Sequence, residues 1–370
     1  MKKIEERFLI SPFLVFFVIS SIQIGVGILG FQRIIAKAAG YDSWISIIVS
    51  GVLVIIIISL MYRMLEKSDD GDIISVHQIV FGKWIGNFLS VLFTIYLVGF
   101  SIVVLRTFIE VIQVWLFPEF NVPVFTIYFL ILTYYVISGG FRTVVGISLF
   151  SILLPSYLIF TVIFPLEYSD FGNLLPILDH SLLELANATK GMTLSMMGFE
   201  VLLVFYPFIK KPRESRKWAY LGVSYVTFIY LAYALTAFMF FSEAQLEKQI
   251  WATLSMWKIV ELPFVARFEY IGIASYVLII LPNICLALWA SSRGIKRIFS
   301  IKQKSALIIQ MIVALLVISL LNSRQVINLA NDILAELGFY FNFLYIPLLF
   351  VLLVIRTKMR EKNEENPNHK

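Results

Sequence analysis

The sequence has very little of the side-chain chemistry that enzymes use. Its single cysteine, Cys285, lies in an apolar run with no base nearby, so an intrachain disulfide and a paired nucleophile are both excluded. The three histidines, His77, His180 and His369, fall in two separate loops and in the C-terminal tail, so they do not form a metal cluster. A Gly-x-x-x-x-Gly-Lys phosphate loop is also missing. We therefore expect no metal, no cofactor and no enzymatic activity.

Charged residues are scarce as well. Only 15% of the 370 residues are charged, whereas 59% are hydrophobic and the mean hydropathy is +0.87. One soluble core cannot bury that much apolar surface, so the composition indicates a polytopic protein of the lipid bilayer. The net charge of +6 comes from lysines and arginines in short loops, where membrane orientation explains them. We therefore exclude nucleic acid as a partner.

Hydrophobic runs of the length that a bilayer requires, roughly 20 residues, recur along the chain. We predict an all-α polytopic fold with about ten transmembrane helices. The predicted spans are about 11–30, 43–64, 85–114, 124–138, 144–166, 191–209, 218–241, 270–290, 306–321 and 338–355. Two polar segments, 76–81 and 181–188, are expected to form surface helices between spans.

Basic residues cluster in two of the predicted loops. Five lie within 210–217 and five within 293–304, so both loops are predicted to be cytoplasmic. Counting single crossings from these loops places the N- and C-termini on the same inner side. Residues 1–355 are expected to form a single transmembrane domain, and 356–370 a disordered cytoplasmic tail.

The first span contains the stretch Gln23-Ile24-Gly25-Val26-Gly27-Ile28-Leu29-Gly30. Each interior glycine costs about 1 kcal/mol of helix stability relative to alanine and leaves the backbone unshielded. We expect a broken helix here. Unpaired backbone groups within a bilayer must be surrounded by protein or water, so the break predicts a small polar pocket. Close helix packing through small residues is the alternative explanation.

Span six offers a weaker match to this break, as the first helix of a second group of five. Its small and polar residues at the same depth are Thr193, Ser195, Gly198 and Glu200. The predicted repeats, about 11–166 and about 191–355, form an inverted pair in which helices one and six are both broken. Such pairs bind solutes at their interface, where the positive end of a half-helix holds a carboxylate and free carbonyls accept an ammonium group. Simple amino acids carry both groups.

Several short elements together resemble a known family. They are the glycine-rich first span, Phe81-Gly82-Lys83-Trp84-Ile85-Gly86 before span three, Gly198-Phe199-Glu200 in span six, and the ten-span length. Over nearly the whole chain they resemble the B subunits of spore germinant receptors, also called spore germination permeases, a branch of the amino acid/polyamine/organocation transporter superfamily. The resemblance implies a LeuT-like fold, residence in the inner spore membrane or the cell membrane, and recognition of a small germinant such as an amino acid or sugar. It also implies a complex with separate A and C subunits.

Charged residues are costly inside a span. Glu200 is predicted to form an ion or proton site or a structural hydrogen bond to the broken helix, with a position near the membrane face as the alternative. Arg106 and Glu110 lie four residues apart in span three and are predicted to form an ion pair near the outer end of that helix.

Polar and aromatic residues at helical spacing complete the predicted pocket. Tyr96 and Phe100 lie one turn apart on span three, where aromatic packing is the alternative. Tyr276, Asn283 and Ala287 share a face of span eight, and Asn283 binds either a solute or the carbonyl that the preceding proline frees. The candidate ligand-binding residues are Gly25, Val26, Gly27, Tyr96, Phe100, Ser195, Met197, Gly198, Phe199, Glu200, Tyr276, Asn283 and Ala287.

Two functions of different classes follow from this pocket. In the first, the chain is a solute sensor that binds a germinant and biases a two-state element that its partners detect. In the second, it is a transporter that moves an amino acid by alternating access. The sequence does not separate the two.

Overall fold

The computed structural model describes residues 4–263 and 265–365. Within these residues the chain is helical, and only two isolated bridges, Ile10 with Ile209 and Leu262 with Val265, have β geometry. The α-helices are α1 (Leu14–Gln23), α2 (Phe31–Ala39), α3 (Trp44–Glu66), α4 (Ile73–Trp115), α5 (Val122–Ser138), α6 (Phe141–Leu153), α7 (Ile163–Leu166), α8 (Leu182–Gly191), α9 (Thr193–Met196), α10 (Leu202–Phe205), α11 (Pro212–Phe240), α12 (Glu243–Leu246), α13 (Ala252–Trp257), α14 (Phe268–Phe299), α15 (Gln303–Leu320), α16 (Arg324–Phe339) and α17 (Ile346–Glu365).

Short helical segments join several of these helices. One of them, η8, is a π-helix between α16 and α17, and the others are 3-10 helices. They are η1 (Glu6–Phe8), η2 (Val26–Leu29), η3 (Gly40–Ser43), η4 (Leu154–Val162), η5 (Phe171–Leu174), η6 (Phe199–Val201), η7 (Tyr206–Phe208) and η8 (Tyr340–Tyr345).

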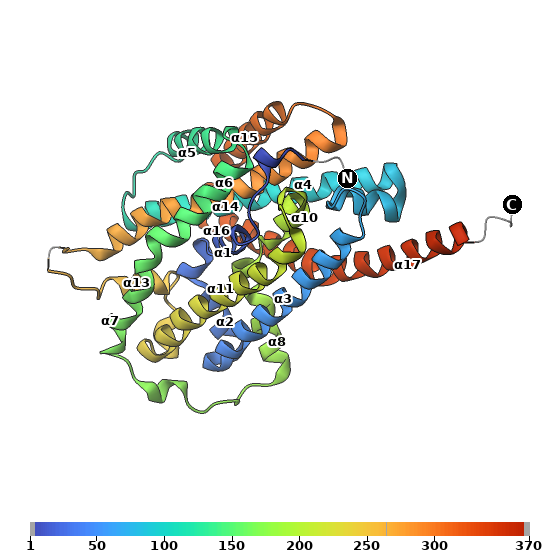
Figure 1. Ribbon diagram of the computed structural model, residues 1–370. Helices are drawn as coiled ribbons and strands as arrows, with labels where there is room; N and C mark the ends of the chain where they lie inside the picture. The colour runs from blue at the N-terminus through green and yellow to red at the C-terminus, as the bar shows by residue number, and fades with distance from the viewer. Residues whose placement is uncertain (1–3, 264, 366–370) are drawn as a thin grey trace.

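The bundle is organised around α1 and α14. Helix α1 packs against α6, α11 and α14, and α14 packs along α4 (Figure 1). In the most apolar window of α14, 72% of the residues are buried, compared with 28% in α15, so α14 is central and α15 peripheral. Figure 1 shows α5 and α15 together at one edge and α17 projecting away from the bundle.

Seven helical stretches in the described part of the chain are long and apolar enough to cross a membrane. They are Phe31–Glu66, Ile73–Trp115, Phe141–Leu166, Pro212–Phe240, Phe268–Phe299, Gln303–Leu320 and Arg324–Arg360. Three further apolar helices, Leu14–Gln23, Val122–Ser138 and Phe199–Phe208, are shorter. The predicted spans one, four and six fall on these three helices, so the structure contains fewer full-length spans than predicted. The multi-pass membrane character of the chain is confirmed.

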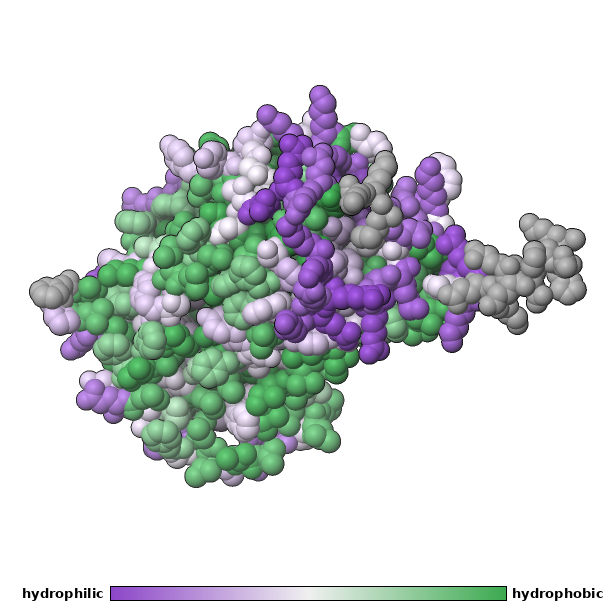
Figure 2. Space-filling model, in the orientation of Figure 1, coloured by the Kyte–Doolittle hydropathy of each residue, from purple (hydrophilic) through white to green (hydrophobic). Residues whose placement is uncertain are grey.

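Large apolar side chains cover much of the molecular surface. Trp84 is 91% exposed, and Tyr135 and Leu320 are each 75% exposed. Figure 2 shows apolar residues over most of the visible face, whereas hydrophilic residues gather around the N-terminal region and the projecting end of α17. In water such a surface would be unfavourable, so its natural surroundings are lipid.

Four predicted boundaries differ from the structure. The expected surface helix 76–81 is the first part of α4, which kinks at Gly82, where φ is 76°. The expected surface helix 181–188 is α8. Helix α8 continues through Met192 into α9, so there is no break between it and the predicted start of span six at residue 191. Helix α17 continues to Glu365 beyond the predicted boundary at residue 355, while 366–370 lie outside the described residues.

The fourth difference is α16, for which no helix was predicted between residues 321 and 338. The Ser323 side chain accepts a hydrogen bond from the Val326 N–H at its start, an arrangement that favours helix formation. Its polar residues recur every three or four positions, so this amphipathic helix did not register as a hydrophobic run.

Candidate functional site

The first helical stretch is interrupted in the middle of the bundle. Helix α1 ends at Gln23, and Ile24 and Gly25 have extended backbone conformations before η2 begins at Val26. Neither η2 nor α2, which starts at Phe31, has a side-chain cap at its first turn. The interruption therefore leaves backbone N–H and C=O groups that must find partners elsewhere.

A second interruption lies beside the first. Helix α9 ends at Met196, Met197 is extended, and Gly198 is left-handed with φ of 105° before η6 begins at Phe199. Only glycine adopts this conformation without strain. An added Cβ at Gly198 would also lie 2.8 Å from the Ile22 side chain, so the two interruptions are in close contact.

Three side chains satisfy the carbonyls that the interruptions release. Gln23 Nε2 donates to the Met196 carbonyl at 2.6 Å, which links the end of α1 to the end of α9. The Tyr230 hydroxyl contacts the carbonyl oxygens of Gln23 and Ser195 at 3.2 and 2.9 Å. Asn283 Nδ2 lies 2.8, 3.3 and 2.9 Å from the carbonyl oxygens of Ser21, Ile24 and Ile279, which share its two hydrogens.

The predicted role of Asn283 is thereby corrected in part. Proline at position 282 frees the carbonyl four residues earlier, that of Leu278, but Asn283 donates elsewhere. Two of its three acceptors, Ser21 and Ile24, belong to the interrupted first stretch. The side chain therefore holds the broken backbone against α14.

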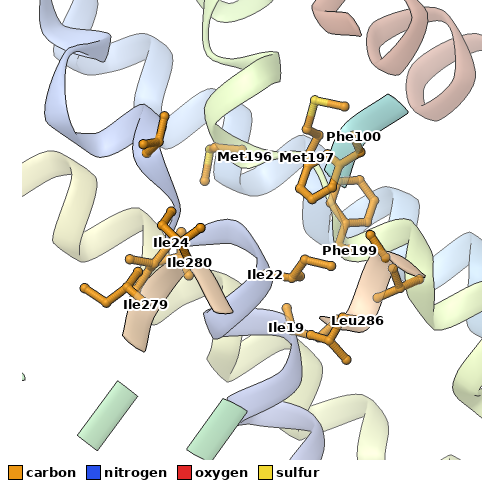
Figure 3. Close-up of a cluster of buried hydrophobic side chains, with 14 of the residues drawn as sticks. Ile19, Ile22, Ile24, Phe100, Met196, Met197, Phe199, Ile279, Ile280 and Leu286 are labelled. Carbon is orange, nitrogen blue, oxygen red and sulfur yellow. The ribbon is translucent and has the colours of Figure 1, made fainter. Parts of the chain in front are cut away.

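Apolar side chains surround both interruptions. Figure 3 shows Ile22, Ile24, Met196, Met197 and Phe199 in one buried cluster between α1, α9 and α14. Each of these side chains is at most 8% exposed. The released polar groups therefore sit in a low-dielectric environment, where an unpaired hydrogen-bonding group is expensive.

A cavity of about 360 Å³ lies against the two interruptions. Its volume is typical of a site for a small molecule. Among the predicted site residues, those that line this cavity are Gly25, Val26, Gly27, Phe100, Ser195, Met197 and Asn283. Gln23 and Asn283 are each 1% exposed and mark the deep end of the cavity. The side chains of Lys37, Asn328 and Asp332 are exposed, so the cavity opens to the surface at their end.

Glycine is required where the two segments meet at the cavity. A Cβ at Gly25 would lie 2.9 Å from Asn283 Oδ1. A Cβ at Gly27 would lie 2.8 Å from Ser195 Oγ and 3.2 Å from Ser195 Cα. Side chains at these positions would occupy the space between the interruptions.

Charged side chains line the open end of the cavity. Arg33 and Lys37 come from α2, and Arg324 and Asp332 from α16. Arg324 Nη1 pairs with Glu110 Oε2 of α4 at 2.6 Å, and the guanidinium carbon lies 5.2 Å from the ring centroid of Trp251. With Glu110 counted as the partner of Arg324, three cations and two acids leave one net positive charge at this end.

The predicted ion pair between Arg106 and Glu110 is wrong. Glu110 pairs with Arg324, whereas Arg106 Nε donates to the Leu321 carbonyl at 2.7 Å and Nη1 to Gln113 Oε1 at 3.3 Å. Helix spacing brings residues four apart to one face, but packing of α16 against α4 decides which partner the carboxylate meets.

Six predicted site residues do not line this cavity: Tyr96, Gly198, Phe199, Glu200, Tyr276 and Ala287. Gly198 and Phe199 belong to the second interruption, and Ala287 is fully buried in α14. Tyr276 lines a separate cavity of about 50 Å³ beside Ile24 and Ile28.

Glu200 is fully buried behind the second interruption. Its Oε2 accepts from the Gly198 N–H at 2.8 Å, and its Oε1 accepts from the Tyr96 hydroxyl of α4 at 2.5 Å. No lysine or arginine pairs with it among the described residues. The side chain of Asn342 lies beside Glu200 and Tyr96, but neither its nitrogen nor its oxygen forms a hydrogen bond among the described residues. These contacts connect the interrupted backbone to α4.

The prediction missed the cavity residues of α16 and their neighbours on α4. Asn331 exchanges a 3.3 Å hydrogen bond with Thr107, and both residues line the cavity together with Asn328. The signal was present in the spacing of Arg324, Asn328 and Asp332, four residues apart on one helix face. No helix is predicted between residues 321 and 338, where this polar stripe lies.

Comparison with known sequences identifies the family. The sequence model described as spore germination protein matches residues 9–327. The chain is 44% identical to spore germination protein GerQB of Bacillus cereus over 360 residues, which cover 97% of this chain and 100% of that protein. This chain belongs to the spore germination protein family. Another member, spore germination protein A2 of Bacillus subtilis (strain 168), is 26% identical over 308 residues, covering 79% of this chain and 81% of that protein.

Solved transporter structures share the fold of this family member. A substrate-bound, outward-open Na+-coupled sialic acid symporter aligns with a TM-score of 0.61 at 11% identity, covering 95% of this chain and 78% of that chain. MhsT in complex with L-phenylalanine aligns with a TM-score of 0.59 at 16% identity, covering 92% of this chain and 87% of that chain. At such low identity the likeness shows a LeuT-like transporter fold and nothing about the ligand.

Proposed function

We propose that this chain is the germinant-sensing membrane subunit of a spore germination receptor, and that it binds a small nutrient, an amino acid, in the cavity beside the two helix interruptions. The observation that carries the proposal is the cavity itself. It is about 360 Å³ in volume, it is polar at its deep end, and it lies where two interrupted helices meet. Family membership and the transporter fold support the same reading.

The hydrogen-bonding state of Gln23 supports a ligand with a donor group. The Met196 carbonyl only accepts, so the Gln23 atom that faces it must be the NH₂ group. The side-chain oxygen then points elsewhere, and it is buried without a hydrogen-bond partner among the described residues. A buried acceptor left unpaired costs about 1–3 kcal/mol, which a ligand donor that reaches this oxygen would recover.

The charges at the open end support a ligand that also carries an anionic group. Arg33, Lys37 and Arg324 line this end with Asp332, and Arg324 is also paired with Glu110. An amino acid with a hydrogen-bond donor toward Gln23 and its carboxylate toward these cations matches the polarity of both ends.

The membrane arrangement that accompanies this function has about ten crossings, each close to the roughly 20 residues that a bilayer requires. They form two inverted repeats, about 11–166 and about 191–355, with the interrupted stretches as their first helices. We infer from the basic loops that both termini lie in the cytoplasm. The proposed location of the chain is the inner spore membrane or the cell membrane. The A and C subunits of the receptor complete the assembly, and ligand binding shifts a two-state element that they detect.

The ligand proposal is tested by thermal unfolding of the purified full-length chain with amino acids, sugars and nucleosides. An amino acid that binds the folded state stabilises it by about 2.7 kcal/mol at 100 times its dissociation constant. We expect Gln23→Leu to lose this stabilisation, because it removes the acceptor. A stabilisation by sugars or nucleosides alone would replace the amino acid with another ligand class.

Gln310→Leu is the matched control for that variant. Gln310 Nε2 donates to Ser291 Oγ at 2.8 Å, and its oxygen is also buried without a partner among the described residues, but it does not line the cavity. We expect Gln310→Leu to keep the full ligand effect even if the folded protein is less stable. Equal losses in both variants would show that the effect of Gln23→Leu is general destabilisation.

The alternative function is an amino-acid transporter that works by alternating access, which the shared fold favours. Uptake of labelled amino acids into proteoliposomes that contain this chain alone separates the two functions. A sensor subunit gives binding without concentrative uptake. Concentrative uptake at ordinary carrier rates would defeat the proposal of a sensor without transport.

A further inference from the structure

A second hollow of comparable size lies on the outer surface of the bundle. Its lining is apolar, unlike that of the polar cavity. It is a groove of about 370 Å³ between α5 and α15, which lie together at one edge of the bundle (Figure 1). Four side chains from each helix line it, from Tyr134 and Ile308 at one end to Ile127 and Leu315 at the other. The contact between Lys304 and Tyr134 brings the start of α15 to the end of α5, so the two helices run antiparallel along the groove.

The lining favours a flexible chain over a partner helix. All eight side chains are isoleucine, leucine, methionine or tyrosine. Helices that associate in membranes approach through glycine, alanine, serine or threonine, none of which lines this groove. A helix is also about 10 Å wide with its side chains, whereas an acyl chain is much thinner and adapts to a narrow hollow.

A positively charged lysine side chain lies at one end of the groove. Lys304 Nζ lies 5.7 Å from the ring centroid of Tyr134, the side chain that ends the groove. Lys302 precedes it by two residues and is exposed like Lys304. Neither lysine forms an ion pair among the described residues. Both belong to the basic loop that the proposed orientation places at the cytoplasmic surface.

We propose that the groove between α5 and α15 is a binding site for an anionic phospholipid of the inner leaflet. One acyl chain lies along the apolar groove, and the phosphate of the headgroup lies at Lys304 and Lys302. An apolar channel with a cation at its interfacial end matches the two parts of such a lipid in order and in polarity. A neutral lipid fills the groove equally well but gains nothing from the two lysines.

One helix separates the groove from the polar cavity. Helix α15 lines the groove and packs on α14, which carries Asn283 at the deep end of the polar cavity. The lipid site stands on the groove and its lysines alone, so it does not depend on the ligand proposed above.

The test compares phosphatidylglycerol with phosphatidylcholine of identical acyl chains, added to the detergent-purified full-length chain. Native mass spectrometry counts the bound lipids, and thermal unfolding reports their effect. We expect phosphatidylglycerol to bind in preference and to raise the unfolding temperature. Lys302→Gln combined with Lys304→Gln should weaken phosphatidylglycerol binding about thirtyfold, because each lysine contributes attraction to an anionic headgroup.

Lys67→Gln combined with Lys83→Gln is the matched control, since both lysines are exposed and lie on other elements. This control should keep the preference for phosphatidylglycerol. Ile312→Trp fills the groove at a side chain that is 53% exposed, so folding should be unchanged while bound phosphatidylglycerol decreases.

Three results would overturn the proposal. The first is equal binding of the two lipids, and the second is an unchanged preference after both groove lysines are neutralised. The third is an Ile312→Trp protein that binds lipid normally but fails to assemble with other receptor subunits, which would assign the groove to a partner helix.

Discussion

Single atoms decide whether the deep end of the cavity exists. At Gly27, the nearest neighbours of an added Cβ would be Ser195 Oγ at 2.8 Å and Ser195 Cα at 3.2 Å. The serine side chain can rotate, but its Cα belongs to the backbone of α9 and moves only with that helix. A methyl group at this position therefore separates the two interruptions and reduces the space between them.

We expect Gly27→Ala to lose the ligand-dependent stabilisation from protein that still folds. Its folded state should be less stable by about 1–3 kcal/mol, the usual effect of overpacking. Thermal unfolding with and without the amino acid measures both quantities. Gly99→Ala on α4 is the control, since no atom lies within 4 Å of its added Cβ, and it should keep the ligand effect. A normal ligand response in folded Gly27→Ala protein would rule out the cavity as the binding site.

At the scale of elements, the second interruption is held by one carboxylate. Glu200 joins the backbone at Gly198 to Tyr96 on α4, so it fixes the start of η6 against another helix. Glutamine at this position retains one oxygen acceptor and offers an NH₂ group to the tyrosine hydroxyl, which can itself accept. Leucine would leave both partners without a hydrogen bond.

We expect Glu200→Leu to destabilise the protein by about 1–3 kcal/mol for each buried group left unpaired. Glu200→Gln should cost much less and impair the ligand response only in part. Thermal unfolding of both variants, combined with Tyr96→Phe in a double-mutant cycle, measures the coupling. If Glu200→Gln instead changes the pH dependence of the ligand response without affecting stability, the carboxylate exchanges a proton and is more than a structural link.

At the scale of the whole molecule, the basic loops determine how the chain sits in the membrane. Lys211 and Lys296 lie in the two predicted cytoplasmic loops and are exposed, and Asp179 is exposed in the long loop before α8. Lysine and arginine are retained on the cytoplasmic side during insertion. An inverted repeat of five helices requires the two basic loops to share one side.

We expect a cysteine at Lys211 or Lys296 to react with a membrane-impermeant reagent only from the cytoplasmic side, and a cysteine at Asp179 only from outside. The background is Cys285→Ala, although the native thiol is buried and should react little. Labelling of right-side-out and inside-out vesicles provides the measurement. The opposite pattern would reverse the proposed orientation and move the lipid groove away from the inner leaflet. Labelling of the two basic loops from different sides would remove the inverted-repeat arrangement.

Composition and local sequence sufficed for the class of the protein and for one half of its candidate site. Apolar runs interrupted by basic loops indicate a multi-pass helical membrane protein whatever their packing, because each span must satisfy its own backbone. The clustered glycines at Gly25 and Gly27 are likewise a local signal. The depth of Ser195 in span six and the position of Asn283 on one face of span eight predicted both as site residues, and both line the cavity.

Only the tertiary structure decided which residues from distant helices meet. Packing of α16 against α4 gave Glu110 the partner Arg324 in place of Arg106 and brought Asn331 to Thr107. The meeting of the ends of α1 and α9 placed Gln23 Nε2 at the Met196 carbonyl, and the side-chain oxygen has no partner among the described residues. Helical periodicity predicts which residues share a face. The rotation of each helix about its axis and the choice of its neighbours depend on contacts along its whole length. For that reason the charged end of the cavity could not be predicted from any single segment.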